Sequence, residues 1–188
     1  MDTRQQLVTL LARRSAKRGT FVLSSGRTSN LYIDARLTSM SAEGLTLIGS
    51  LGLAAIREAF DVPPTDAVGG LTLGADPIAY AIAYASASSS RPIQAFTVRK
   101  EPKAHGAGRQ VEGAFHPGDR VVVVEDVITT GGSALKAVEV LRAHQADIAG
   151  ILALVDREEG GRELLENAGL RVISLARASE ILPLLPPT

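Results

Sequence analysis

Apolar and polar residues alternate along the chain with two different periods. Leu7, Leu10 and Leu11 repeat at the spacing of one helix face, whereas the run Val121–Val124 is apolar throughout, as in a strand buried on both faces. Applied to the whole chain, these two patterns predict a set of helices and strands. Helices are expected at residues 3–17, 41–60, 74–87, 132–144 and 161–168, and strands at residues 21–23, 31–33, 67–69, 93–98, 120–124, 148–155 and 171–175.

Strands that are apolar on both faces and separated by helices predict an α/β fold with a parallel sheet covered on both sides. A chain of 188 residues is long enough for one core and short for two, so residues 1–188 are expected to form a single domain. Residues 1–40, approximately, precede the alternation and are expected to form a small N-terminal hood. Residues 183–188 are expected to be a frayed tail.

The balance of charges limits the partners of the chain. Its 20 Lys and Arg residues equal its 20 Asp and Glu residues, so no general affinity for nucleic acid or for a membrane surface is expected. The absence of cysteine excludes disulfides and thiolate metal sites and is typical of a reducing cytoplasm. The N-terminus lacks the apolar stretch of a signal peptide, and residues 78–87 are too short a run to span a bilayer. A soluble, cytoplasmic protein is expected.

The most informative segment follows the apolar run at residues 121–124. The run ends in Glu125 and Asp126, and residues 129–133, Thr-Thr-Gly-Gly-Ser, precede a helix. The backbone N–H groups and hydroxyls of such a loop form an anion site at the helix N-terminus, and the two acids suit the hydroxyls of a sugar attached to that anion. The alternative is a capped strand–turn–helix with two solvated acids, which the complete run makes the weaker interpretation.

This segment resembles the motif by which type I phosphoribosyltransferases bind phosphoribosyl pyrophosphate (PRPP). The resemblance implies their Rossmann-like parallel-sheet fold, with Glu125 and Asp126 on the ribose hydroxyls, residues 129–133 around the 5-phosphate, and Asp126 also catalytic. The full PRPP-binding set that it implies, together with the basic segment described next, is Arg99, Lys100, Lys103, His105, Glu125, Asp126, Val127, Ile128, Thr129, Thr130, Gly131, Gly132 and Ser133.

A second unusual segment, residues 99–113, is both basic and rich in glycine. Its glycines and its position directly after a strand predict a mobile lid that neutralises a pyrophosphate leaving group and excludes water. The alternative is a solvated surface loop, which is the usual explanation of a charge run; the position at a strand end favours the lid. The basic or potentially basic residues are Arg99, Lys100, Lys103, His105 and Arg109.

The lid resembles the catalytic loop of orotate phosphoribosyltransferases in its pattern Arg-Lys-Glu-x-Lys-x-His-Gly-x-Gly. This pattern is more specific than the PRPP motif, which purine-salvage enzymes share. The resemblance implies that Lys103 and His105 are catalytic and, with Arg99, contact pyrophosphate in the neighbouring subunit's site, while Lys100 serves its own subunit. It also implies a homodimer with shared active sites.

The base pocket is implied by a segment that resembles the Asp-Arg-x-Glu motif of the same family, residues 156–159. Arg157 would pair with the carboxylate of orotate, since a guanidinium fork suits a carboxylate, and Thr129 would also touch the base. From spacing alone, a surface salt bridge from Arg157 to Glu158 or Glu159 is an equally good interpretation. Residues 70–77 resemble the family's pyrophosphate-contacting loop.

Residues 21–34 resemble the hood that covers the base in this family, with Tyr32 expected to stack on one side of it. Many members of the family carry Lys where this chain has Ser24. Arg27 is one candidate to replace that charge.

The reaction that the resemblance implies joins orotate to PRPP and gives orotidine 5′-monophosphate and pyrophosphate, a step of pyrimidine nucleotide synthesis. Mg²⁺ is expected to arrive mainly on PRPP rather than in a site made of protein ligands. The nearest alternative is a purine phosphoribosyltransferase, which should lack both the Lys-x-His-Gly lid and Arg157. A PRPP-sensing regulator is a further alternative, which should lose lid residues or add a nucleic-acid surface.

Overall fold

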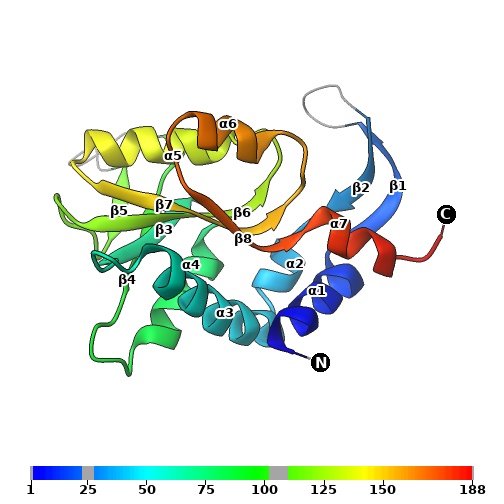
Figure 1. The fold of residues 1–188 in the computed structure, drawn as a ribbon, viewed down its shortest axis with the longest axis horizontal. Helices are drawn as coiled ribbons and strands as arrows, with labels where there is room; N and C mark the ends of the chain where they lie inside the picture. The colour runs from blue at the N-terminus through cyan, green and yellow to red at the C-terminus, as the bar shows by residue number, and fades with distance from the viewer. Residues whose placement is uncertain (1, 23–27, 102–109, 188) are drawn as a thin grey trace.

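A twisted six-stranded sheet organises the chain in the computed structural model, which describes residues 2–22, 28–101 and 110–187 (Figure 1). The strands are β1 (Ala16–Val22), β2 (Thr28–Ile33), β3 (Ala67–Leu71), β4 (Gln94–Val98), β5 (Val111–Gly113), β6 (Arg120–Ile128), β7 (Asp147–Asp156) and β8 (Val172–Arg177). The helices are α1 (Thr3–Arg14), α2 (Arg36–Ser39), α3 (Ala42–Phe60), α4 (Asp76–Ser86), α5 (Gly132–Ala143), α6 (Gly161–Asn167), α7 (Ala178–Ile181) and the 3₁₀-helix η1 (Leu182–Leu184).

The main sheet has the strand order β5-β4-β3-β6-β7-β8. Every neighbouring pair is parallel except β4 and β5, which are antiparallel. The predicted α/β fold with a parallel sheet is therefore confirmed. The short edge strand β5 was not predicted, because its three residues lie inside the glycine-rich stretch 99–113 and show no alternation.

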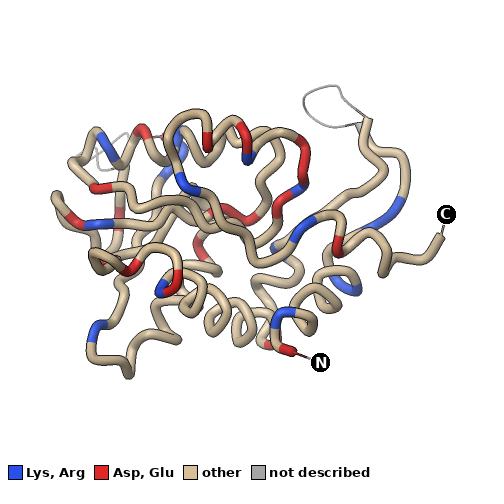
Figure 2. The backbone as a smooth tube through the Cα atoms, in the orientation of Figure 1, with Lys and Arg blue, Asp and Glu red and all other residues tan. Residues whose placement is uncertain are grey.

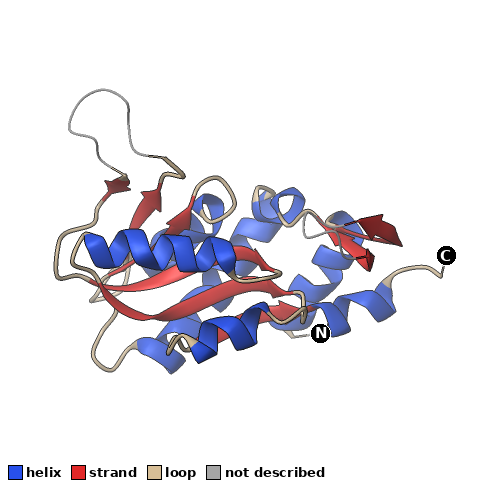
Figure 3. Cartoon of the chain, turned by 90° about the horizontal axis from the view of Figure 1, so that it is seen from above, coloured by secondary structure: helices blue, strands red, loops and turns tan. Residues whose placement is uncertain are grey.

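Helices cover both faces of this sheet and create two cores. Val122 and Val124 of β6 pack into the core under α3 and α4, whereas Val121 and Val123 pack into the core under α5 and α6. Figure 3 shows the same layers from above, with α5 lying along the strands. Successive side chains of a strand point to opposite faces, so the all-valine run supplies both cores at once.

The antiparallel hairpin β1–β2 is separate from the main sheet and stands beyond one end of it (Figure 1). It begins directly after α1 and leads into α2. In Figure 2 acidic and basic residues are interspersed over the described backbone, with no face of one sign. Within the described ranges, no helix is both long and apolar enough to cross a membrane.

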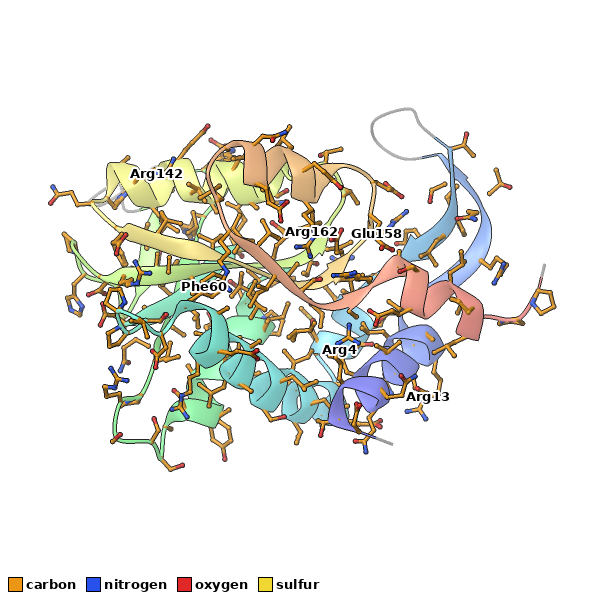
Figure 4. All side chains as sticks on the ribbon, viewed as in Figure 1. Arg4, Arg13, Phe60, Arg142, Glu158 and Arg162 are labelled. Carbon is orange, nitrogen blue, oxygen red and sulfur yellow. The ribbon has the colours of Figure 1, made fainter. Side chains whose placement is uncertain are left out.

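The C-terminal segment differs from the frayed tail that was predicted. Leu185 is only 7% exposed and joins the core beside α1. Arg18 donates a hydrogen bond of 2.7 Å to the carbonyl oxygen of Leu182, and Arg4 pairs with Glu180 at 2.6 Å (Arg4 is labelled in Figure 4). Leu182 and Leu185 of this segment bury apolar surface in the core, whereas Leu184 is exposed, and the prolines around them concealed this pattern in the sequence.

Candidate active site

A polar cleft of about 360 Å³ opens where strands β3, β6 and β7 end and where β2 leads into α2. This is the edge at which ligands bind in open α/β sheets. The cleft brings together residues 32–36 and Arg157, which lie more than 100 residues apart in the sequence, with the acid pair, Thr129 and Ser133. It is lined by Tyr32, Ile33, Asp34, Ala35, Arg36, Leu71, Thr72, Leu73, Gly74, Lys100, Glu125, Asp126, Val127, Thr129, Ser133 and Arg157.

The two acids of the cleft lie within the last part of β6 rather than after it. The predicted strand ended at Val124, but pairing with β7 continues as far as Ile128 and Asp156, because Val127 and Ile128 extend the strand beyond the two acids. Burial raises the pKa of Glu125 to about 9, and the neighbouring charge of Asp126 adds to the effect. Glu125 therefore holds its proton at neutral pH.

The loop between β3 and α4 lies against the acid pair. A Cβ atom added to Gly74 would be 2.4 Å from the carboxylate carbon of Asp126, so only glycine permits this approach. The peptide bond between Thr72 and Leu73 is cis. The predicted pyrophosphate-contacting loop, residues 70–77, thus borders the same cleft as Asp126.

Residues 129–133 form a small hollow of about 30 Å³ at the N-terminus of α5. Gly131 has a φ of +82° in the left-handed region, which lets the backbone turn sharply into the helix. The hollow is lined by backbone and by the side chains of Thr129, Thr130 and Ser133, as an anion cradle requires. The structure places the predicted phosphate loop beside the acid pair in one continuous site.

Arg157 follows β7 and is buried, with only 4% of its side chain exposed. Its Nη2 atom donates hydrogen bonds to Ser29 Oγ and to the carbonyl oxygen of Leu31, both at 2.8 Å, and to Glu159 Oε1 at 2.7 Å. Its Nε atom has no hydrogen-bond partner in the described part of the chain. The salt bridge that the spacing allowed does exist, but it is buried rather than on the surface, and the same guanidinium also lines the cleft.

The loop that carries Arg157 is fixed by its other polar residues. Arg162 of α6 donates to Asp156 Oδ2 at 2.7 Å, and Glu158 accepts from the backbone N of Ser179 at 2.7 Å (Glu158 and Arg162 are labelled in Figure 4). Glu158 has a φ of +57°, so the backbone turns at this residue. Each carboxylate of the loop therefore has its own partner, and Glu159 is the one assigned to Arg157.

The hairpin wall of the cleft carries Tyr32, which is 43% exposed and whose ring lies 5.4 Å from that of Phe21. Two further cleft residues, Asp34 and Arg36, were missed by the sequence reasoning. Arg36 Nε pairs with Asp34 Oδ1 at 2.8 Å, and this contact lowers the pKa of Asp34 and raises that of Arg36. The signal available in the sequence was an acid and a base two residues apart, directly after a predicted strand.

The basic stretch is described only at its two roots. Arg99 pairs with Glu112 at 3.2 Å, and Arg99 N donates to the carbonyl oxygen of Gln110, so the roots form a hairpin stem between β4 and β5. Of its basic residues, Lys100 lines the cleft, whereas Arg99 does not. Lys103 and His105 lie outside the described residues, as do Ser24 and Arg27.

Comparison with known proteins identifies the class first. The family model described as the phosphoribosyl transferase domain matches residues 69–173. This range contains most of β3, all of β6 and β7, and the loop at residues 129–133. The solved structure of adenine phosphoribosyltransferase from Leishmania donovani shares the fold at a TM-score of 0.67 with 20% identity. The fold is therefore that of the phosphoribosyltransferases, and it does not by itself select a base.

Relatives of higher sequence identity show which family within this class the chain belongs to. Orotate phosphoribosyltransferase from Aquifex aeolicus (strain VF5) is 50% identical over 97% of this chain and 99% of that protein. The orotate phosphoribosyltransferase of Sorangium cellulosum (strain So ce56) is 45% identical over 98% of this chain and 95% of that protein. The crystal structure of the Mycobacterium tuberculosis H37Rv enzyme in complex with PRPP has a TM-score of 0.78 and 38% identity, and the match covers 96% of this chain and 99% of that one. The chain belongs to the orotate phosphoribosyltransferase family.

Proposed function

We propose that this protein transfers ribose 5-phosphate from PRPP to orotate and releases orotidine 5′-monophosphate and pyrophosphate. The observation that carries the proposal is the buried Arg157 in the wall of a cleft that also holds the acid pair and the phosphate loop. A buried guanidinium with an unused donor is suited to a ligand carboxylate, and orotate is a nucleobase that carries one. The family to which the chain belongs supports the same base.

The ribose 5-phosphate portion of PRPP fits the residues around the end of β6. In the proposed complex, the backbone N–H groups and hydroxyls of residues 129–133 bind the 5-phosphate. Asp126 accepts hydrogen bonds from the ribose hydroxyls and stabilises positive charge that develops at the anomeric carbon. Glu125, which is protonated at neutral pH, binds a ribose hydroxyl without adding a second negative charge beside Asp126.

The base lies between β2 and the loop after β7 in this proposal. Arg157 and Thr129 bind orotate, and Tyr32 stacks on one side of the ring. Because the Arg157 guanidinium is held by three acceptors before any ligand arrives, its orientation costs little when orotate binds.

The pyrophosphate is assigned to the other side of the cleft, with residues 70–77, Lys100, and the proposed lid residues Lys103 and His105. These cations would stabilise the departing pyrophosphate, and His105 or Lys103 would donate a proton to it. The cleft offers the carboxylate oxygens of Asp126, which are ligands of a type that suits Mg²⁺. When bound with PRPP, Mg²⁺ would neutralise part of the pyrophosphate charge.

We also propose a cytoplasmic homodimer in which Arg99, Lys103 and His105 reach the partner's site. The position of Arg99 outside its own cleft supports this assignment. Tyr80 and Tyr84, one turn apart on α4, are 53% and 85% exposed, as expected of residues that a second subunit covers. Sedimentation at micromolar concentration would measure the oligomeric state.

The decisive experiment follows orotate by ultraviolet absorbance with PRPP and Mg²⁺, for the wild type and for Lys103→Ala. Consumption by the wild type that is strongly slowed in the variant supports both the base and the lid. If orotate is not consumed while adenine, hypoxanthine or guanine is, the PRPP site stands and the assignment of the base is wrong.

A further inference from the structure

Three cations line the described part of the cleft: Arg36, Lys100 and Arg157. They differ in how their donors are used. Arg157 is buried and bound to three acceptors, whereas Arg36 is half-exposed and, among the described residues, bound only to Asp34. No role is assigned to Arg36 by the proposed function above.

The Arg36 guanidinium is held in one orientation by Asp34. Nε donates to Oδ1 at 2.8 Å and Nη2 donates to Oδ2 at 3.0 Å, while the backbone N of Arg36 donates to Oδ1 at 3.2 Å. This fork uses one edge of the guanidinium, and Nη1 makes no hydrogen bond with any described residue. The opposite edge is therefore available to a ligand anion.

Arg36 is on the Asp126 side of the cleft. Arg36 and Asp126 line the same cleft, and the charge of Asp126 adds a smaller contribution to the raised pKa of Arg36, which is caused mainly by Asp34. Asp126 in turn lies against Gly74 of the β3–α4 loop. Ser29 and Leu31, which Arg157 contacts, lie earlier in β2. At about 3.3 Å per residue, the strand runs roughly 13 Å from Ser29, and roughly 7 Å from Leu31, to Ile33 before Arg36 is reached.

The reaction itself separates these two ends. Displacement at the anomeric carbon requires the attacking base and the leaving pyrophosphate to be in line, on opposite sides of that carbon. If Arg157 binds the base, the pyrophosphate must lie across the ribose from it, toward the β3–α4 loop. We infer that Arg36, oriented by Asp34, binds the pyrophosphate group of PRPP within its own subunit.

This inference rests on the proposed function for the position of the base, and binding measurements can test it separately. The proteins are the wild type, Arg36→Ala, Arg36→Lys and, as a control, Arg13→Ala, an exposed arginine that pairs with Glu43 on the outer surface (Figure 4). Calorimetry with Mg²⁺ present measures the Kd of pyrophosphate, of PRPP, and of the nucleotide of whichever base the wild type consumes.

Arg36→Ala is expected to raise the Kd of pyrophosphate and of PRPP roughly 10- to 100-fold, as the loss of a charge-assisted hydrogen bond does. The Kd of the nucleotide, which has no pyrophosphate, should remain within about twofold. Arg36→Lys should recover part of the affinity because it keeps the charge without the fork. Arg13→Ala should change none of the three.

The inference is overturned if pyrophosphate binds Arg36→Ala as it binds the wild type. It is also overturned if the nucleotide loses as much affinity as PRPP, since Arg36 would then act on the base, the ribose or the folding of the hairpin. Failure of the wild type to consume orotate is a different result: it refutes the proposed base, while the pyrophosphate and PRPP titrations still decide the role of Arg36.

Discussion

The two ends of the cleft are built in opposite ways. At the end of β7, Arg157 has 4% of its side chain exposed and is held by Ser29, Leu31 and Glu159. Where β2 leads into α2, Arg36 has 49% of its side chain exposed and is hydrogen-bonded to one of the described residues, Asp34, and Lys100 is also exposed. One end is organised before any ligand arrives, and the other offers cations that still have donors free.

This difference matches the demands of the two substrates in the proposed reaction. A planar base must be distinguished from other bases, which needs fixed polar groups that are costly to leave unpaired. The pyrophosphate group must bind as part of PRPP and be released as a product. This favours exposed cations, which water solvates when the site is empty. Selectivity is therefore expected to reside in the buried end and ionic-strength dependence in the exposed end.

The largest effect is expected from Arg157→Ala. Losing the charge-assisted hydrogen bonds to orotate and leaving Glu159 without its cation should lower kcat/KM for orotate by about 10²- to 10³-fold. Steady-state kinetics measures this, and the Kd of PRPP serves as the control because it should stay near the wild-type value. A kcat/KM within about threefold of the wild type would contradict the assignment of the buried end to the base.

A smaller effect, on stability, is expected at Glu125, which lies between the two ends. Since the pKa of this group is raised from 4.5 to about 9 in the folded protein, the folded state holds a proton that the unfolded state releases between these values. The free energy of unfolding therefore decreases as pH rises between these values, by at most about 1.4 kcal/mol per pH unit. Glu125→Gln removes this dependence, so its Tm relative to the wild type should increase from pH 6 to pH 8. A constant difference in Tm would mean that Glu125 is ionised in the folded state.

Glu159→Gln tests whether Arg157 needs its partner's charge. The amide keeps the shape but weakens the hold on Nη2, so the KM for orotate should rise about tenfold with kcat less affected. Glu158→Gln is the matched control, because its carboxylate binds Ser179 instead. An equal rise in KM in both variants would show that the loop as a whole, rather than the Glu159–Arg157 pair, sets affinity for the base.

The smallest effect is expected from salt. Exposed charges are screened over a Debye length of about 10 Å at 0.1 M and 3 Å at 1 M ionic strength, whereas buried pairs are screened less. Raising potassium chloride across this range should increase the KM for PRPP severalfold and change that for orotate less. A parallel rise in both values would remove the distinction between the two ends.

Most of the fold and the centre of the site could be predicted from the sequence. The apolar runs of β3, β6 and β7 identified a parallel sheet, and the rule that ligands bind at carboxyl strand ends brought Asp126, residues 129–133 and Arg157 into one cleft. These signals are local, because each motif directly follows its own strand.

What the sequence did not reveal depends on contacts between distant segments. Arg36 follows a hairpin strand outside the main sheet, so the strand-end rule did not select it. The burial of Arg157 comes from Ser29 and Leu31, which lie well over 100 residues earlier in the chain. The docking of Leu185 similarly depends on α1, which a short proline-rich segment does not indicate by itself.

Strand β6 contributes to both cores through its valine run and to the cleft through the two acids that follow it. Val121 to Val124 alternate between the two cores, and Glu125 and Asp126 directly follow them in the same strand. Inserting or deleting one residue in this run would exchange the faces of every side chain beyond it. A change of length here is therefore expected to be tolerated less well than the replacement of one of these buried valines by isoleucine, which adds a methylene group but leaves the faces unchanged.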